Sequence, residues 1–145
     1  MNNKKLTFTV LVAGMMLASC VSYGTKKVTV QKEQLIHHRF VLETVNGENL
    51  PEGVKTPELN FNEGLHISGA MCNQFTGQAS LSEGVLKAKK VAMTRKLCTD
   101  PQLNQLDATI SKMLHDGAQV DLTENQLTLA TANDSLIYKL ADRVQ

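Results

Sequence analysis

Hydrophobic and polar residues alternate along most of the chain between residues 38 and 98, as they do in half-buried β-strands. The clearest case is a hairpin in which segments 58–62 and 65–68 alternate on either side of Glu63-Gly64. Its apolar side carries Leu59, Phe61, Leu65 and Ile67. Further strands are expected at 39–45, 74–81, 85–88 and 91–94. Strand signals at intervals of roughly ten residues predict a sandwich or a barrel.

The period changes after Cys98, where apolar residues recur at helical spacing. Asp100-Pro101 is typical of a helix start, with an N-cap acceptor followed by proline at the first helical position. The apolar stripe consists of Leu103, Leu106, Ile110, Met113 and Leu114. Gly117 suits the left-handed cap that ends a helix. The pattern predicts one helix of about 14 residues, whose stripe has to be covered by a sheet.

Three further alternating segments close the chain. They are expected as strands at 118–122, 126–130 and 136–140, joined by the short turns 123–125 and 133–134. Adjacent strands with short turns form a meander, and closing such a sheet removes its exposed edges. The sequence therefore predicts a mainly β (α+β) fold, a small antiparallel β-barrel-like meander with one packed α-helix.

The first 20 residues have the pattern of a secretory signal peptide. Lys4 and Lys5 precede the apolar run 6–17, which is too short to span a bilayer as a helix. The run ends in Leu17-Ala18-Ser19-Cys20, which resembles the lipobox of bacterial lipoproteins. That resemblance implies acylation of Cys20 and anchoring to membrane lipid, and Val21 after the cysteine favours the outer membrane, facing the periplasm. We expect a flexible tether at 21–35 and a single domain at 36–142.

The balance of charges restricts the class of partner. The chain has 15 basic and 14 acidic residues, and removal of residues 1–20 leaves 13 basic against 14 acidic. A near-neutral mature protein argues against nucleic acid as a partner and against a polybasic membrane-surface protein.

The three cysteines of the chain predict one disulfide if one of them carries lipid. If Cys20 is acylated, Cys72 and Cys98 remain, and two cysteines of a small domain in an oxidising compartment are expected to pair. Closing a loop of about 26 residues stabilises a fold by roughly 3–4 kcal/mol in the chain-entropy model. The alternative is two buried free thiols that pack as small hydrophobic groups.

No catalytic constellation is evident along the chain. The sequence contains no glycine-rich phosphate loop, nucleophile elbow or paired-cysteine zinc spacing. His37, His38, His66 and His115 are interpreted as structural or solvated rather than as metal ligands. Cys72 as a nucleophile would need a base, and no histidine lies near it in the sequence. We expect no metal and no cofactor.

Two segments taken together resemble the paired signatures of the META domain family. They are Ser68-Gly69-Ala70-Met71-Cys72-Asn73-Gln74-Phe75-Thr76-Gly77 and Ala92-Met93-Thr94-Arg95-Lys96-Leu97-Cys98. The motif residues are Gly69, Cys72, Asn73, Phe75, Gly77, Met93, Thr94 and Arg95. Met71 departs from the family, which often has glycine there. The resemblance implies a compact antiparallel β-barrel-like fold with one helix, secreted or envelope-bound, tied to stress or virulence and without an established catalytic activity.

Two functions compete on this basis. The leading hypothesis is a non-enzymatic lipoprotein of the heat-shock or envelope stress response that binds a periplasmic protein or a cell-wall component. The alternative is a lipocalin-like barrel that holds a small hydrophobic or toxic compound. The barrel interior discriminates between them, because a ligand has no room if it is filled by Phe40, Leu42, Phe61, Ile67, Val91 and Leu129. In either case we expect Cys72 to brace the strand turn, with Asn73 supporting the turn and Gly69 and Gly77 allowing the bend.

Overall fold

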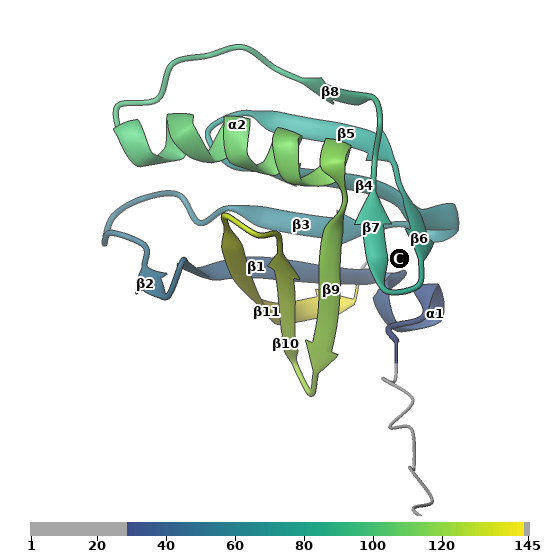
Figure 1. Ribbon diagram of the computed structural model, residues 1–145. Helices are drawn as coiled ribbons and strands as arrows, with labels where there is room; N and C mark the ends of the chain where they lie inside the picture. Colours follow the sequence, from purple (N-terminus) through teal and green to yellow (C-terminus); the bar gives the residue numbers. More distant parts are fainter. Residues whose placement is uncertain (1–28, 144–145) are drawn as a thin grey trace, which may run out of the picture.

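The computed structural model describes residues 29–143 and consists mainly of one curled antiparallel sheet (Figure 1). The elements are α1 (Lys32–Leu35), β1 (His38–Val45), β2 (Glu48–Asn49), β3 (Glu58–Phe61), the 3₁₀ turn η1 (Glu63–Leu65), β4 (His66–Ala70), β5 (Gln74–Gln78), β6 (Ser80–Ser82), β7 (Val85–Lys87), β8 (Val91–Met93), α2 (Pro101–Asp116), β9 (Ala118–Thr123), β10 (Gln126–Ala130) and β11 (Ser135–Arg143). The predicted fold class is confirmed.

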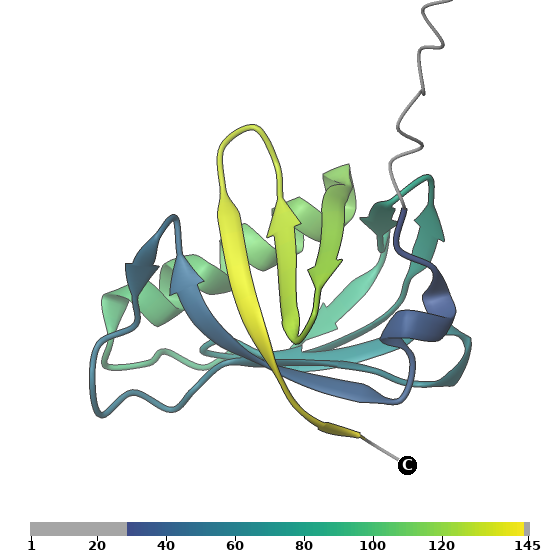
Figure 2. The same ribbon diagram turned by 90° about the horizontal axis from the view of Figure 1, so that it is seen from below.

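The order of strands in the sheet is β6-β7-β9-β10-β11-β1-β3-β4-β5-β8, and β2 pairs with β1. The sheet curls into a half-barrel, and α2 lies across its open side (Figure 2). Strand β1 is central because it pairs with β3 on one side and with the last strand, β11, on the other. The chain passes from β5 into β6 through Ala79 alone, whose N–H donates to the carbonyl of Leu65 at 3.0 Å.

The helix α2 begins and ends where the sequence predicts. The carboxylate of Asp100 accepts a hydrogen bond from the Gln102 N–H at 2.7 Å, and Gly117 ends the helix with a φ of 101°. The helix has 16 residues, two more than expected. All five residues of its predicted stripe are buried, so burial against the sheet is what stabilises this helix rather than propensity alone.

The interior of the half-barrel is packed with side chains. Phe40 and Phe61 meet edge to face with ring centroids 5.9 Å apart, and both are at most 1% exposed. Leu42, Ile67 and Leu129 are buried as well, whereas Val91 is half-buried at the side of the core. Five of the six residues chosen to discriminate between the two functions therefore fill the interior, which does not favour a lipocalin-like binding cavity.

Part of the segment expected to be a tether packs against the domain. Leu35 in α1 is fully buried and Val30 is 6% exposed. The predicted signal peptide, Cys20 and most of the predicted tether lie outside the described residues. None of the helices in the part of the chain that the structure describes is long and apolar enough to cross a membrane.

Candidate functional site

The turn between β4 and β5 carries the first family motif and is buried. Met71, Cys72 and Asn73 are each no more than 5% exposed. The Met71 N–H donates to the Asn73 carbonyl at 3.1 Å, which closes the turn. Asn73 is the one polar residue among those described that is buried. Its hydrogen bonds therefore determine whether this turn is stable.

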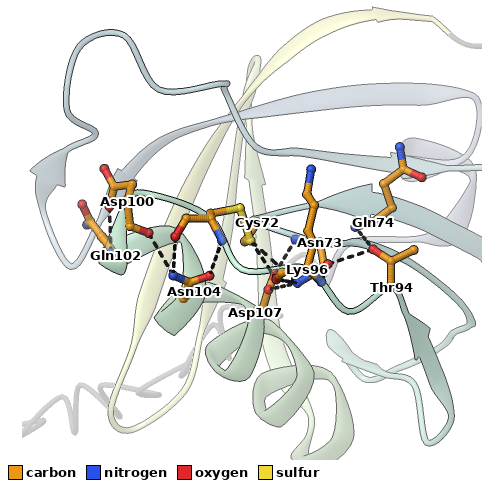
Figure 3. The surroundings of a disulfide bond; sticks show 10 residues. Cys72, Asn73, Gln74, Thr94, Lys96, Asp100, Gln102, Asn104 and Asp107 are labelled. Carbon is orange, nitrogen blue, oxygen red and sulfur yellow. Dashed lines mark hydrogen bonds between the residues drawn. A yellow bond between two sulfur atoms is a disulfide. The ribbon is translucent and has the colours of Figure 1, made fainter.

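The side chain of Asn73 makes every hydrogen bond of which a carboxamide is capable (Figure 3). Its Nδ2 donates to the carbonyl of Lys96 at 3.0 Å and to Oδ2 of Asp107 at 2.7 Å. Its Oδ1 accepts from the Thr94 hydroxyl at 3.0 Å and from the Lys96 N–H at 2.7 Å. Two donors and two acceptor lone pairs are thus satisfied. We refer to Asn73, Thr94, Lys96 and Asp107 as the Asn73 cluster.

Two further bonds extend the cluster into the backbone. Oδ1 of Asp107 accepts from the Asn73 N–H at 2.9 Å, so this carboxylate binds both the side chain and the main chain of Asn73. The Thr94 hydroxyl accepts from the Gln74 N–H at 3.1 Å. The cluster therefore joins three elements that are distant in sequence, namely the β4–β5 turn, the segment after β8 and the helix α2.

Sequence reasoning did not single out Asp107. A signal was present, because Asp107 follows Leu103 by four positions and precedes Ile110 by three, which places it beside the buried stripe of α2. A carboxylate in that position needs a partner, and the buried Asn73 supplies it.

The disulfide between Cys72 and Cys98 ties the same two loops covalently. The predicted pairing is seen, with the two Cα atoms 5.8 Å apart. Cys98 is held in turn by Asn104 of α2, whose Oδ1 accepts from the Cys98 N–H at 3.0 Å and whose Nδ2 donates to its carbonyl at 2.9 Å. The expected brace between the strand turn and the segment entering the helix is present, and Figure 3 shows how closely it neighbours Asn73.

The two motif glycines lie within strands rather than at the bend. Gly69 in β4 lies between Glu58 in β3 and Phe75 in β5, and a Cβ atom at Gly69 would clash with the backbone carbonyl of Glu58 and lie 2.6 Å from Cζ of Phe75. Gly69 is therefore required for the close approach of the Glu58 carbonyl and the buried Phe75 ring, which differs from the expected role in turning the chain. At Gly77 the nearest atoms to a Cβ are 3.4 Å away, so this position is less constrained.

The remaining motif residues divide between interior and surface. Met93 in β8 is half-buried, and it pairs with Phe75 in β5. Arg95 is exposed, as is Lys96, whose backbone rather than its ammonium group belongs to the Asn73 cluster. The next residue, Leu97, is 88% exposed. The motif thus combines a buried polar framework with an outward-facing loop.

No candidate metal centre is found among residues 29–143, where histidine, cysteine and carboxylate side chains form no group suited to hold an ion. His37 precedes β1 with a φ of 64°, and His38 is the first residue of that strand. His66 and His115 are exposed, and Nδ1 of His115 lies 3.1 Å from the carboxylate of Asp116. Hydrogen bonds from Lys112 and then His115 hold the pKa of Asp116 below its usual value.

A second polar cluster lies on the outer face of the sheet. Nη1 of Arg39 is 2.9 Å from the carboxylate of Glu58, and Nε is 2.8 Å from that of Asp142. These hydrogen bonds, that of Asp142 first, raise the pKa of Arg39. We refer to the three residues as the Arg39 cluster, which joins β1, β3 and β11 at the surface.

Comparison with known proteins identifies the family of this chain. The META domain model matches residues 33–143, and the chain belongs to the META domain family. Among curated proteins it is similar to the "Heat shock protein HslJ" of Escherichia coli (strain K12), with 58% identity over 128 residues that cover 88% of this chain and 90% of the relative.

Two solved structures share the fold. An NMR structure with 60% identity superimposes with a TM-score of 0.74, covering 79% of this chain and 97% of the other. An NMR structure of a protein from Burkholderia xenovorans, 22% identical, superimposes with a TM-score of 0.60 and covers 77% and 87% of the two chains. The second likeness concerns the fold alone.

Proposed function

We propose that this protein is a non-enzymatic, heat-shock-related lipoprotein of the cell envelope that binds a periplasmic protein or a cell-wall component. Its similarity to a heat shock protein supports the link to stress. The basic, apolar and lipobox pattern of residues 1–20 supports the anchor at Cys20 and a location at the outer membrane facing the periplasm.

The observation that carries this proposal is that Cys72 and Asn73 of the family motif are fully engaged in bonds within the protein. Cys72 is consumed by a disulfide, and every hydrogen-bonding group of the Asn73 side chain is occupied within the protein. A nucleophile or general base needs a free lone pair or a transferable proton directed at a substrate. The buried motif side chains offer neither, so they serve to fix the loop that follows β8.

The disulfide also supports the envelope location. Disulfides persist in oxidising compartments such as the periplasm and are rare where thiols are kept reduced. A bond that joins the two motif segments would form only after export. The proposed location and the motif geometry are therefore consistent with each other.

The test is photo-cross-linking in heat-stressed cells. A photoreactive amino acid replaces exposed residues of the full chain, one variant at a time, and the anchored protein is compared with a Cys20→Ala variant, which lacks the acylated residue. We expect specific cross-links to a periplasmic protein or to peptidoglycan that weaken in the Cys20→Ala variant. Identical background patterns from all positions in both forms would overturn the proposal.

A further inference from the structure

The strand β8 leaves an open edge at one end of the sheet. Among the described residues β8 is paired with β5 alone. The Thr94 N–H donates to the Gln74 carbonyl at 3.0 Å, which sets the alternation of the antiparallel ladder. It follows that the N–H and C=O groups of Val91 and Met93 point away from β5. These groups are available to another strand.

A shallow, open groove lies between the start of β8 and α2. Its volume is about 470 Å³. Lys89 and Val91 form one wall, and Ala108, Ser111, Lys112 and His115 of α2 form the other. Alanine and serine leave room for a backbone to approach, and a groove beside a free strand edge fits an extended peptide better than a flat surface.

The charged residues of the segment that carries β8 all have one sign. Residues 85–99, which we call the basic segment, contain Lys87, Lys89, Lys90, Arg95 and Lys96 and no acidic residue. All five are exposed. The basic segment holds a third of the 15 basic residues of the chain and none of its 14 acidic residues. In Figure 1 the part of this segment that follows β7 runs along one rim of the molecule, above α2.

The far wall of the groove does not cancel this charge. Asp116 is the acidic residue at the groove, and its carboxylate is 2.7 Å from Nζ of Lys112 and 3.1 Å from Nδ1 of His115. Lysines beside an edge strand also protect it against aggregation, which is the simpler explanation of the pattern. That explanation does not account for the groove behind the strand or for the fixed loop that continues it.

That loop holds an apolar side chain in the solvent. Leu97 is 88% exposed, although its neighbours are rigidly placed: Lys96 by the backbone bonds to Asn73, and Cys98 by the disulfide and Asn104. An exposed leucine on a rigid loop costs little ordering entropy when it meets an apolar partner residue.

We propose that β8 is a docking edge for an acidic, extended peptide segment of a protein partner. The segment adds a strand beside Val91 and Met93, lies in the groove along α2, directs its carboxylates at the basic segment and rests an apolar residue on Leu97. Main-chain hydrogen bonds then supply affinity and the charges supply selectivity. This inference rests on the proposed function in one respect, namely that the partner is a protein.

The test measures binding of a fluorescein-labelled peptide of alternating glutamate and valine, about eight residues long, to the detergent-solubilised full chain. A second peptide has the same sequence with N-methylated amides, which keep the charge and remove the donors. We expect the N-methylated peptide and a Lys89→Glu/Lys90→Glu variant each to weaken binding about tenfold, or about 1.4 kcal/mol. A Lys55→Glu/Lys139→Glu variant, altered at two exposed lysines outside the basic segment, is the matched control and should bind as the unaltered chain does. Amide exchange at Val91 and Met93 should slow when the peptide binds.

Several results would overturn the inference. Equal affinity for both peptides would reduce it to charge attraction, and equal weakening by both lysine variants would remove the role of the groove. Absence of peptide binding, together with binding to vesicles of phosphatidylglycerol and phosphatidylethanolamine, would replace the peptide by a lipid surface. Protein cross-links in cells that arise only from positions far from β8 would also contradict it, yet they would leave the proposed function intact.

Discussion

The Asn73 cluster and the Arg39 cluster both join three elements that are distant in sequence, yet they differ in what surrounds them. Asn73 is 5% exposed, whereas the side chains of Arg39 and Glu58 are each 36% exposed and that of Asp142 is 57% exposed. A buried polar group that loses its partners costs about 1–3 kcal/mol, whereas an exposed ion pair contributes about 0–1 kcal/mol. The comparison teaches that burial, more than charge, determines which polar connection the fold depends on.

The largest effect is expected from the covalent part of the Asn73 region. Replacing both cysteines, Cys72→Ser/Cys98→Ser, should lower the free energy of unfolding by about 3–4 kcal/mol, because the unfolded chain regains the entropy of an open loop. Urea denaturation measures the change. Reductant should lower the unaltered chain to the same level and leave the double variant unaffected. If the double variant remains about 3–4 kcal/mol less stable than the unaltered chain in reductant, the loss is due to packing and not to the disulfide.

Removal of the central amide is expected to have the next largest effect. Asn73→Ala deletes four side-chain hydrogen bonds and leaves Oδ2 of Asp107 and the Lys96 N–H without their partner, so the free energy of unfolding should fall by about 2–3 kcal/mol. Thermal and urea denaturation with the disulfide intact provide the measurement. Asn133→Ala, in an exposed turn, is the matched control and should change stability by less than about 0.5 kcal/mol. Similar losses of stability in both variants would contradict the claim that burial makes the hydrogen bonds of Asn73 important for the fold.

A buried polar group without partners tests the same rule in the opposite direction. The hydroxyl of Tyr138 is fully buried and has no hydrogen-bond partner in the protein, and burial raises its pKa. Tyr138→Phe should therefore increase the free energy of unfolding by about 1 kcal/mol. Thr44→Val removes another buried hydroxyl without a partner and should change stability in the same direction. Destabilisation by both changes would show that these hydroxyls are satisfied in solution.

The smallest effect is expected at the surface. Arg39→Met breaks both ion pairs but keeps an apolar stem over the sheet, so the loss should be below about 1 kcal/mol. The loss should shrink further in high salt, which screens exposed charges. Denaturation midpoints at low and high salt measure it. A loss as large as that of Asn73→Ala would reverse the ranking of the two clusters.

Sequence reasoning reached the local elements more readily than the connections between them. The helix α2 was predictable because Asp100, Pro101 and Gly117 mark its ends and its stripe has helical period. The hairpin of β3 and β4 was predictable because its apolar side alternates. Pairing of β1 with β11 was not, because alternation says which face of a strand is buried and not which strand lies beside it.

The same distinction holds within the site. Pairing of Cys72 with Cys98 followed from the number of cysteines and the expected compartment. The bonds of Asn73 to Lys96 could not be predicted, because they involve the backbone of a residue whose side chain is an ordinary exposed lysine. Asp107 was hidden for a related reason: a carboxylate on a helix resembles a solvated residue until its partner is placed.

The pairing of β1 with β11 has a consequence for how the chain reaches its fold. His38 at the start of β1 lies opposite Arg143 at the end of β11, so the middle of the sheet is completed by a strand about 100 residues further along the chain. Contacts so distant in sequence must overcome the entropy of closing a long loop, and folds that depend on them form slowly. A chain cut short before β11 would leave β1 and β10 each without one of their two neighbours and would expose the unpaired edges to proteases. Assembly of this half-barrel is therefore expected to wait until β11 is available, with this strand as its last and decisive part.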